Sequence, residues 1–150
     1  MSWRIVALKF LAFVLLAFWL GGFTVYSAVV IPALHEILAP ADAGHITQHV
    51  TDVLNTLGAA TLFAWWALVY CDRRTMTRRG RRTRVILLLA TTALLAGLVG
   101  LHRLMDDRLS GAGPRGFYPL HRAYLITSTV QWLVNLGLIW VESAREHRDG

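Results

Sequence analysis

Cysteine and charge are both scarce in this chain. A single cysteine, Cys71, in 150 residues excludes an internal disulfide bond and a metal cluster held by several thiolates. Only 16% of the residues are charged and 55% are hydrophobic, whereas the surface of a soluble domain of this size needs more charge. The composition therefore predicts an integral membrane protein.

The sequence also lacks the short motifs that mark several classes of enzyme. It contains no phosphate-binding glycine loop, no dinucleotide-binding fingerprint and no motif that pairs a nucleophile with a base. The net charge of +6 is typical of nucleic-acid binding, but the basic residues lie in short runs between apolar segments, as topology signals do. Nucleic acid is therefore not an expected partner, and no catalytic residue is assigned.

Four apolar segments are long enough to cross a bilayer as helices. They cover about residues 6–36, 44–70, 84–106 and 117–142. The first segment is too long for a signal peptide, and Pro32 near its end is expected to kink its last turn. The length of the chain favours a single domain. We therefore predict an all-α polytopic membrane protein, a four-transmembrane-helix bundle over residues 1–150.

The basic residues predict the orientation of these helices. The N-terminus, the stretch 71–84 with its seven arginines, and the C-terminal tail together carry eleven basic residues, and the other two connections carry four. By the positive-inside rule both termini are cytoplasmic, and the opposite ends of the helices face the periplasm of a bacterium. We expect the seven-arginine stretch to be a loop that sets the topology and contacts anionic lipid.

Two of the predicted helices carry a stripe of polar side chains. In the second helix the stripe consists of His45, His49, Asp52 and Asn55. In the fourth helix it consists of His121, Tyr124, Ser128, Gln131 and Asn135, and seven residues further it reaches Glu142. The spacing places each set on one helix face. Because polar groups inside a bilayer need partners, both stripes are expected to face inward and pack against each other.

Histidines gather at one predicted end of the bundle. The third helix adds His102 and Asp106 there, and the first adds His35. Neutral imidazole is the commonest metal ligand, and two histidines four residues apart on a helix grip one ion. The pattern thus predicts a metal or haem site on the periplasmic side.

The predicted ligands or ligand orienters are His45, His49, Asp52, His102 and His121. The residues expected to surround them, or to form a polar path below them, are His35, Asp106, Tyr124, Ser128, Gln131 and Asn135. The cofactor would be a transition metal (Fe, Cu, Zn or Mn) or a b-type haem held by two imidazoles, and the function redox chemistry or metal handling. If the cofactor is haem, the favoured ligand pairs are His49 with His121 and His49 with His102.

Other interpretations of the same residues stay open. The polar stripes are also typical of side chains that lock helices together, in which case the protein is a non-catalytic accessory subunit of a larger membrane complex, or a homo-oligomer. The stripe of the fourth helix is alternatively a transport or proton path. Arg103 and Arg122 are candidates for an anion or lipid-headgroup site, unless Asp106 and Asp107 neutralise them.

Two segments resemble a known family. Gly21–Pro32, with the sequence GGFTVYSAVVIP, and Phe117–Trp132, with the sequence FYPLHRAYLITSTVQW, are similar to small four-helix bacterial membrane proteins. This is the uncharacterised, DUF4149-like group that includes the eukaryotic transmembrane protein 205. The resemblance implies four transmembrane helices, and it carries over no catalytic residues because none is established for the group. Small b561-type cytochromes share the architecture, but their haem histidines do not map onto these positions.

Overall fold

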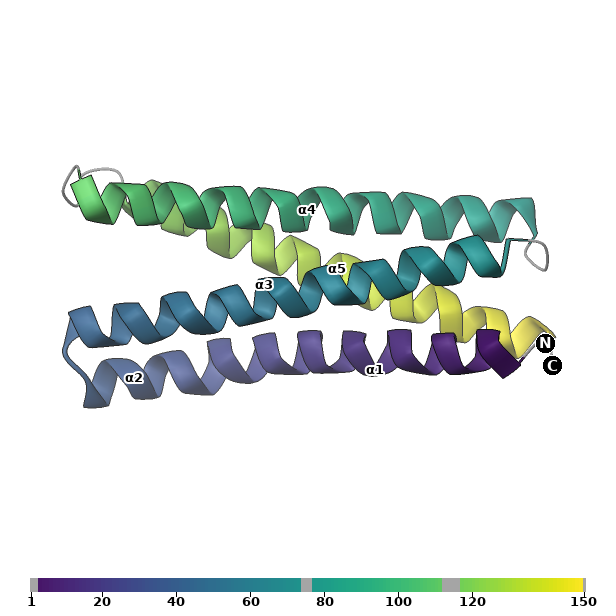
Figure 1. The fold of residues 1–150 in the computed structure, drawn as a ribbon, viewed down its shortest axis with the longest axis horizontal. Helices are drawn as coiled ribbons and strands as arrows, with labels where there is room; N and C mark the ends of the chain where they lie inside the picture. The colour runs from purple at the N-terminus through teal and green to yellow at the C-terminus, as the bar shows by residue number, and fades with distance from the viewer. Residues whose placement is uncertain (1–2, 74–76, 112–116, 150) are drawn as a thin grey trace. The chain divides into compact units, whose positions relative to one another are not determined.

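The computed structural model describes residues 3–73, 77–111 and 117–149. All regular structure in these residues is helical, in agreement with the all-α prediction. The elements are α1 (Trp3–Val25), a π-helical segment η1 (Tyr26–Val30), α2 (Ile31–Ile37), α3 (Pro40–Cys71), α4 (Arg78–Gly111) and α5 (Phe117–Asp149) (Figure 1).

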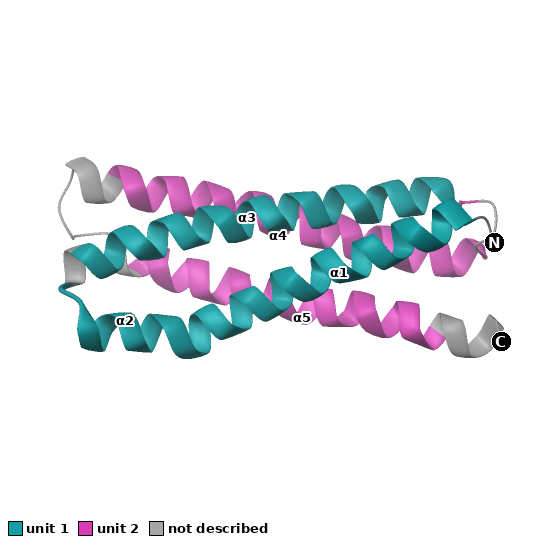
Figure 2. Ribbon diagram, turned by 60° about the horizontal axis from the view of Figure 1, so that its bottom comes forward, with its two compact units in different colours: residues 1–72 teal, residues 73–150 magenta. Residues whose placement is uncertain are grey.

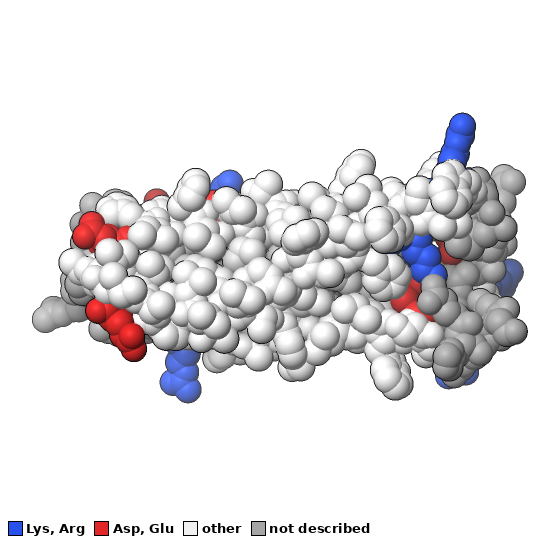
Figure 3. All heavy atoms as spheres, turned by 90° about the horizontal axis from the view of Figure 1, so that it is seen from below, with Lys and Arg blue, Asp and Glu red and all other residues white. Residues whose placement is uncertain are grey.

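Four helical stretches are long and apolar enough to cross a membrane. They are Trp3–Ile37, Asp42–Cys71, Arg78–Asp107 and Pro119–Ala144. On the face drawn in Figure 3, the charged side chains lie toward the ends of the helices, and a long uncharged stretch lies between them. Such a band matches the hydrocarbon layer of a bilayer. The chain is an integral membrane protein.

Two helices begin earlier than the hydrophobic pattern indicates. α3 begins at Pro40 instead of near residue 44, because proline fits the first turn of a helix, where its missing N–H is not needed. α4 begins at Arg78 instead of near residue 84, and the Thr77 hydroxyl accepts a hydrogen bond from the Gly80 N–H at 3.3 Å. The predicted loop 71–84 is therefore largely helical, and its residues 74–76 lie outside the described residues. Arginine is a good helix former, so α4 includes arginines that precede its apolar part.

The first membrane span is irregular just before Pro32. Residues Tyr26–Val30 form a π-helical turn, in which the Ile31 N–H bonds to the Tyr26 carbonyl five residues earlier. Pro32 cannot donate a backbone hydrogen bond, and its ring crowds the carbonyl four residues before it, which belongs to Ala28 in this turn. The expected distortion is thus present, and it takes the form of a π-helical turn between α1 and α2.

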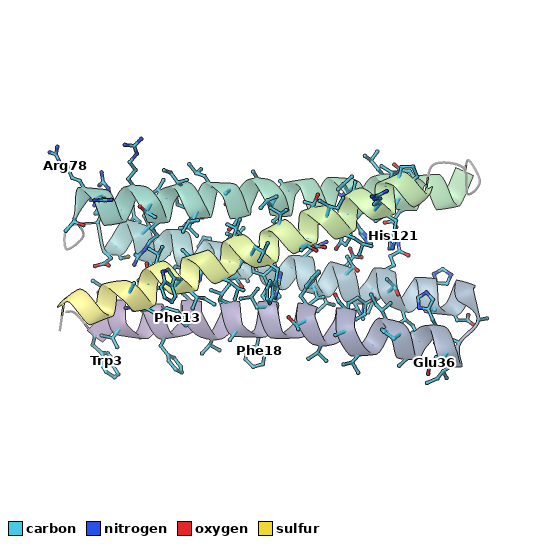
Figure 4. All side chains as sticks on the ribbon, turned by 180° about the vertical axis from the view of Figure 1, so that it is seen from behind. Trp3, Phe13, Phe18, Glu36, Arg78 and His121 are labelled. Atoms are coloured by element: carbon cyan, nitrogen blue, oxygen red, sulfur yellow. The ribbon has the colours of Figure 1, made fainter. Side chains whose placement is uncertain are left out.

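The chain forms two compact units, residues 1–72 and 73–150, and each is a helical hairpin (Figure 2). In the first hairpin α1 packs along α3, and α2 reaches the start of α3. The contact uses aromatic and small residues. A Cβ atom added to Gly58 would lie 2.6 Å from two ring carbons of Trp19, and the rings of Phe13 and Trp65 meet edge to face at 5.2 Å. Trp3 and Phe18 project outward from α1 (Figure 4).

In the second hairpin α4 and α5 pack in one constant antiparallel register. Arg84 contacts Glu142, and Thr91 contacts Asn135. Thr91 lies seven residues after Arg84 on α4, and Asn135 lies seven residues before Glu142 on α5. Eleven residues beyond these, the ring of His102 lies beside the ring of Tyr124. The buried positions of α4 recur at steps of three and four: Arg84, Leu88, Thr91, Leu95, Leu98, His102 and Met105. This is the spacing of coiled-coil packing.

Candidate functional site

Among the histidines of α4 and α5 whose side chains are described, His102 is the buried one. It lies at the interface of α4 and α5, and its side chain is 10% exposed. Its Nε2 lies 3.7 Å from Asp106 Oδ2, one turn further along α4, and its ring centroid lies 6.4 Å from that of Tyr124 on α5. The two helices thus hold one imidazole between a carboxylate and a phenol ring. We call His102, Asp106 and Tyr124 the His102 site.

This arrangement favours chemistry at a single imidazole. In metal sites, an aspartate that accepts a hydrogen bond from one ring nitrogen orients a ligating histidine. At 3.7 Å the pair is in electrostatic contact, beyond ordinary hydrogen-bond distance. Asp106 is partly exposed, so the site reaches the surface of the hairpin near the end of the membrane span.

The other predicted residues of α4 and α5 divide between the interface and the surface. His121 lies near the start of α5, where its side chain is exposed (Figure 4). Arg103, Asp107 and Arg122 are exposed as well. The polar stripe of α5 was expected to face inward toward the stripe of α3. Within the second hairpin it packs against α4, with Ser128, Gln131, Asn135 and Glu142 buried.

The stripe of α3 does not take part in the contact with α1. His45, His49 and Asp52 are exposed in the first hairpin, and their packing against the stripe of α5 stays a prediction. The face that packs on α1 is formed instead by small and apolar positions such as Gly58 and Trp65. Small residues let the backbones approach closely, which imidazole and carboxylate side chains cannot do. His35 is exposed too, with its Nδ1 2.9 Å from the Ile31 carbonyl oxygen of its own helix.

No group of three or more histidine, cysteine, aspartate or glutamate side chains is arranged to hold a metal ion within residues 3–73, 77–111 and 117–149, insofar as these are described. The pair of the predicted set that the structure brings together is His102 with Asp106. A metal centre at the His102 site therefore needs ligands beyond this pair.

The most buried polar contact is one that the sequence pattern did not reveal. Arg84 donates from Nε and Nη2 to the two carboxylate oxygens of Glu142, and both side chains are 1% exposed. The sequence analysis placed Arg84 in a loop and Glu142 at the end of a polar stripe. The sequence could have indicated this pair, because Arg84 lies seven residues before Thr91 and therefore on the helix face that also carries His102. A buried carboxylate needs a cation beside it, and Arg84 is the arginine that this register supplies.

Further buried polar groups connect this ion pair to the His102 site. Thr91 Oγ1 donates to Asn135 Oδ1 at 3.2 Å, and Ser128 Oγ donates to the Leu125 carbonyl oxygen at 2.9 Å. Gln131 Nε2 is buried and has no hydrogen-bond partner among the described residues. We call the buried polar residues along the α4–α5 contact the polar seam; its members are Arg84, Thr91, His102, Ser128, Gln131, Asn135 and Glu142.

Tyr26 is a second residue that the sequence analysis did not single out. It lies in the π-helical turn, its side chain is 6% exposed, and its hydroxyl faces the side chain of Thr47 on α3. π-helical turns occur frequently at functional positions. The available signal was Pro32 six residues later, which predicts an irregular backbone at this point.

Comparison with protein families gives one match. The family model described as "Domain of unknown function (DUF4149)" matches residues 14–107. The match includes the segment 21–32 that carries the sequence resemblance, and it extends to His102 and Asp106, whereas residues 117–132 lie outside it. The chain matches no curated protein and no solved structure.

Proposed function

The chain belongs to the DUF4149 family, whose function is unknown, and we propose that it is a small membrane protein for redox chemistry or metal handling, centred on His102. The observation that carries this proposal is the His102 site itself. An ionisable side chain that is buried in a membrane span indicates a functional site, because such groups are costly inside a bilayer. The carboxylate of Asp106 beside the ring is the partner that a ligating imidazole commonly has.

The proposed ligand is a transition-metal ion (Fe, Cu, Zn or Mn), or a b-type haem held by His102 and a second imidazole. His102 would supply one coordinating nitrogen, and Asp106 would hold the ring in place. Tyr124 beside the ring would take part in proton or electron transfer. The side chains of His45, His49, Asp52 and His121 are exposed, and their role as further ligands stays a prediction.

The location proposed for the site is the periplasmic side of a bacterial cytoplasmic membrane, with both termini in the cytoplasm. The support is the distribution of basic residues along the sequence. Arg78, Arg79, Arg81 and Arg82 are exposed at the end of α4 opposite to His102, as cytoplasmic topology signals should be.

The test is an absorption spectrum with elemental analysis of the detergent-purified, untagged protein. We expect a Soret band or about one equivalent of metal, which is lost in His102→Ala. Asp106→Asn should weaken metal retention by about 10- to 100-fold, the usual effect of removing a carboxylate that supports a ligand. His35→Ala is the matched control, because this histidine is exposed and bonds to its own helix. A folded protein without metal or colour, or a His102→Ala variant that keeps either, contradicts the proposal.

A second candidate is a non-catalytic accessory subunit of a larger membrane complex. The exposed stripe of His45, His49 and Asp52 on α3 favours it, because polar side chains on the outside of a membrane helix suit contact with another protein. Purification from native membranes separates the two: a stoichiometric partner supports this role, and a stable protein that elutes alone counts against it.

The transport or proton path along α5 has less support. The apolar position Leu138 separates Asn135 from Glu142, and the Glu142 carboxylate is engaged by Arg84 at both oxygens. Because both oxygens of this carboxylate accept hydrogen bonds from the guanidinium group, neither is open to a transported proton or substrate. Proton flux into liposomes that persists after Gln131→Leu and Asn135→Leu would remove this candidate.

A further inference from the structure

Four arginines at the start of α4 form an exposed charged surface. They are Arg78, Arg79, Arg81 and Arg82, and we call them the arginine patch. Figure 4 shows Arg78 projecting away from the helix end. Arg84, only two residues after the patch, is instead buried against Glu142. The five arginines of residues 78–84 thus divide into one that holds the hairpin together and four whose charges lie outside the hairpin contact.

The depth of the arginine patch follows from the geometry of α4. The apolar part of this span begins at Val85. With a rise of about 1.5 Å per residue, the patch lies roughly 5–10 Å outside the hydrocarbon layer. The headgroup layer on each side of a bilayer is about 5–8 Å thick. The four guanidinium groups therefore lie at the depth of the lipid phosphates.

The protein does not neutralise this charge in the part of the chain that the structure describes. None of the four arginines forms an ion pair with a described carboxylate, and the first turn of α4 contains no acidic residue. Among the described side chains of α5, the carboxylate at this end is that of Glu142, and Arg84 binds both of its oxygens. Four like charges within five residues repel one another, so binding of anions from outside the protein is favoured.

We propose that the arginine patch binds the phosphates of anionic phospholipids, of the phosphatidylglycerol class, in the leaflet that contains the start of α4. Guanidinium groups bind phosphate through two parallel hydrogen bonds, and several arginines along two helical turns can engage more than one headgroup. Lipid is favoured over free phosphate because a lipid phosphate is held at the depth of the patch. This inference is independent of the function proposed for His102.

Native mass spectrometry of the detergent-purified full chain tests the inference. Phosphatidylglycerol and the zwitterionic phosphatidylcholine are titrated separately into the protein. We expect retained phosphatidylglycerol and little phosphatidylcholine. In the variant R78Q/R79Q/R81Q/R82Q, retention of phosphatidylglycerol should fall at least tenfold, because each basic residue near an anionic surface contributes roughly fivefold in affinity. The control variant R4Q/K9Q removes two basic residues of α1 and should retain the lipid.

Several results would overturn the inference. Equal retention of both lipids, an equal loss in both variants, or displacement of the lipid by millimolar inorganic phosphate would each do so. If the fourfold variant does not fold, the wild-type protein still tests the inference. Its retention of phosphatidylglycerol must fall in about 1 M salt, because charges are then screened beyond roughly 3 Å. Retention that does not depend on salt would contradict binding through the arginine patch.

Discussion

The two hairpins are held together by different kinds of contact. In the first hairpin, α1 and α3 meet through rings and small residues, with Trp19 lying against Gly58. In the second, α4 and α5 meet along the polar seam, with a charged pair near one end and His102 toward the other. In a bilayer an apolar contact gains little over contact with lipid, so the first hairpin depends on close fit and the second on polar pairs.

The polar seam also restricts the register of its hairpin more strongly. A shift of α5 by one turn would separate Arg84 from Glu142 and Thr91 from Asn135 at the same time. In hydrocarbon each separated group would lose its partner without gaining water. In the first hairpin, a similar shift would exchange one apolar contact for another, and the steric fit at Gly58 and Gly22 is what opposes it.

The largest expected effect comes from breaking the ion pair. Glu142→Ala leaves Arg84 buried without its counterion, and removing one partner of a buried pair lowers the free energy of unfolding by about 3–5 kcal/mol. Chemical denaturation in detergent micelles measures it. The double variant Arg84→Met/Glu142→Leu should recover most of the stability, because apolar groups replace both charges. A loss below about 1 kcal/mol in Glu142→Ala would mean that the pair does not hold the second hairpin together.

A smaller effect tests the close fit of the first hairpin. In Gly58→Ala the new methyl group would lie 2.6 Å from ring carbons of the buried Trp19, so the helices must shift apart. Overpacking of this kind lowers the free energy of unfolding by about 1–3 kcal/mol. Gly21→Ala is the matched control in the same hairpin, because a Cβ atom there meets nothing within 4 Å. If the two variants unfold at the same denaturant concentration, close approach does not stabilise this hairpin.

The smallest expected effect is a difference in stability between variants of two amides in the polar seam. Asn135 accepts a hydrogen bond from Thr91, whereas Gln131 Nε2 is buried without a partner among the described residues. Asn135→Leu should therefore destabilise the protein more than Gln131→Leu. A double-mutant cycle of Thr91→Val and Asn135→Leu should give a coupling near 0.6 kcal/mol, the average for such bonds in membrane proteins. A larger loss in Gln131→Leu would show that its amide binds a partner.

Part of the candidate site could be predicted from the sequence. The stripe on α5 was recognised because steps of three and four are a property of the helix alone, and the burial of Ser128, Gln131 and Asn135 confirms it. The stripe of His45, His49 and Asp52 is equally regular, but it is not the face of α3 that packs on α1. Periodicity shows which residues share a face, but the neighbouring helix decides which face is buried. On α3 that face belongs to Gly58 and Trp65, which fit the rings of α1.

The sequence by itself determined the helical class and the four membrane spans, because hydrophobicity and helix length are local properties that need no knowledge of neighbours. The tertiary structure decided which polar groups are buried. Among the described arginines of the stretch 71–84, Arg84 is buried because Glu142 on α5 lies opposite to it. Among the histidines of α4 and α5 with described side chains, His102 is buried because Tyr124 packs beside it. Burial of a charge or an imidazole depends on a partner distant in the chain, and that pairing exists only when the helices pack.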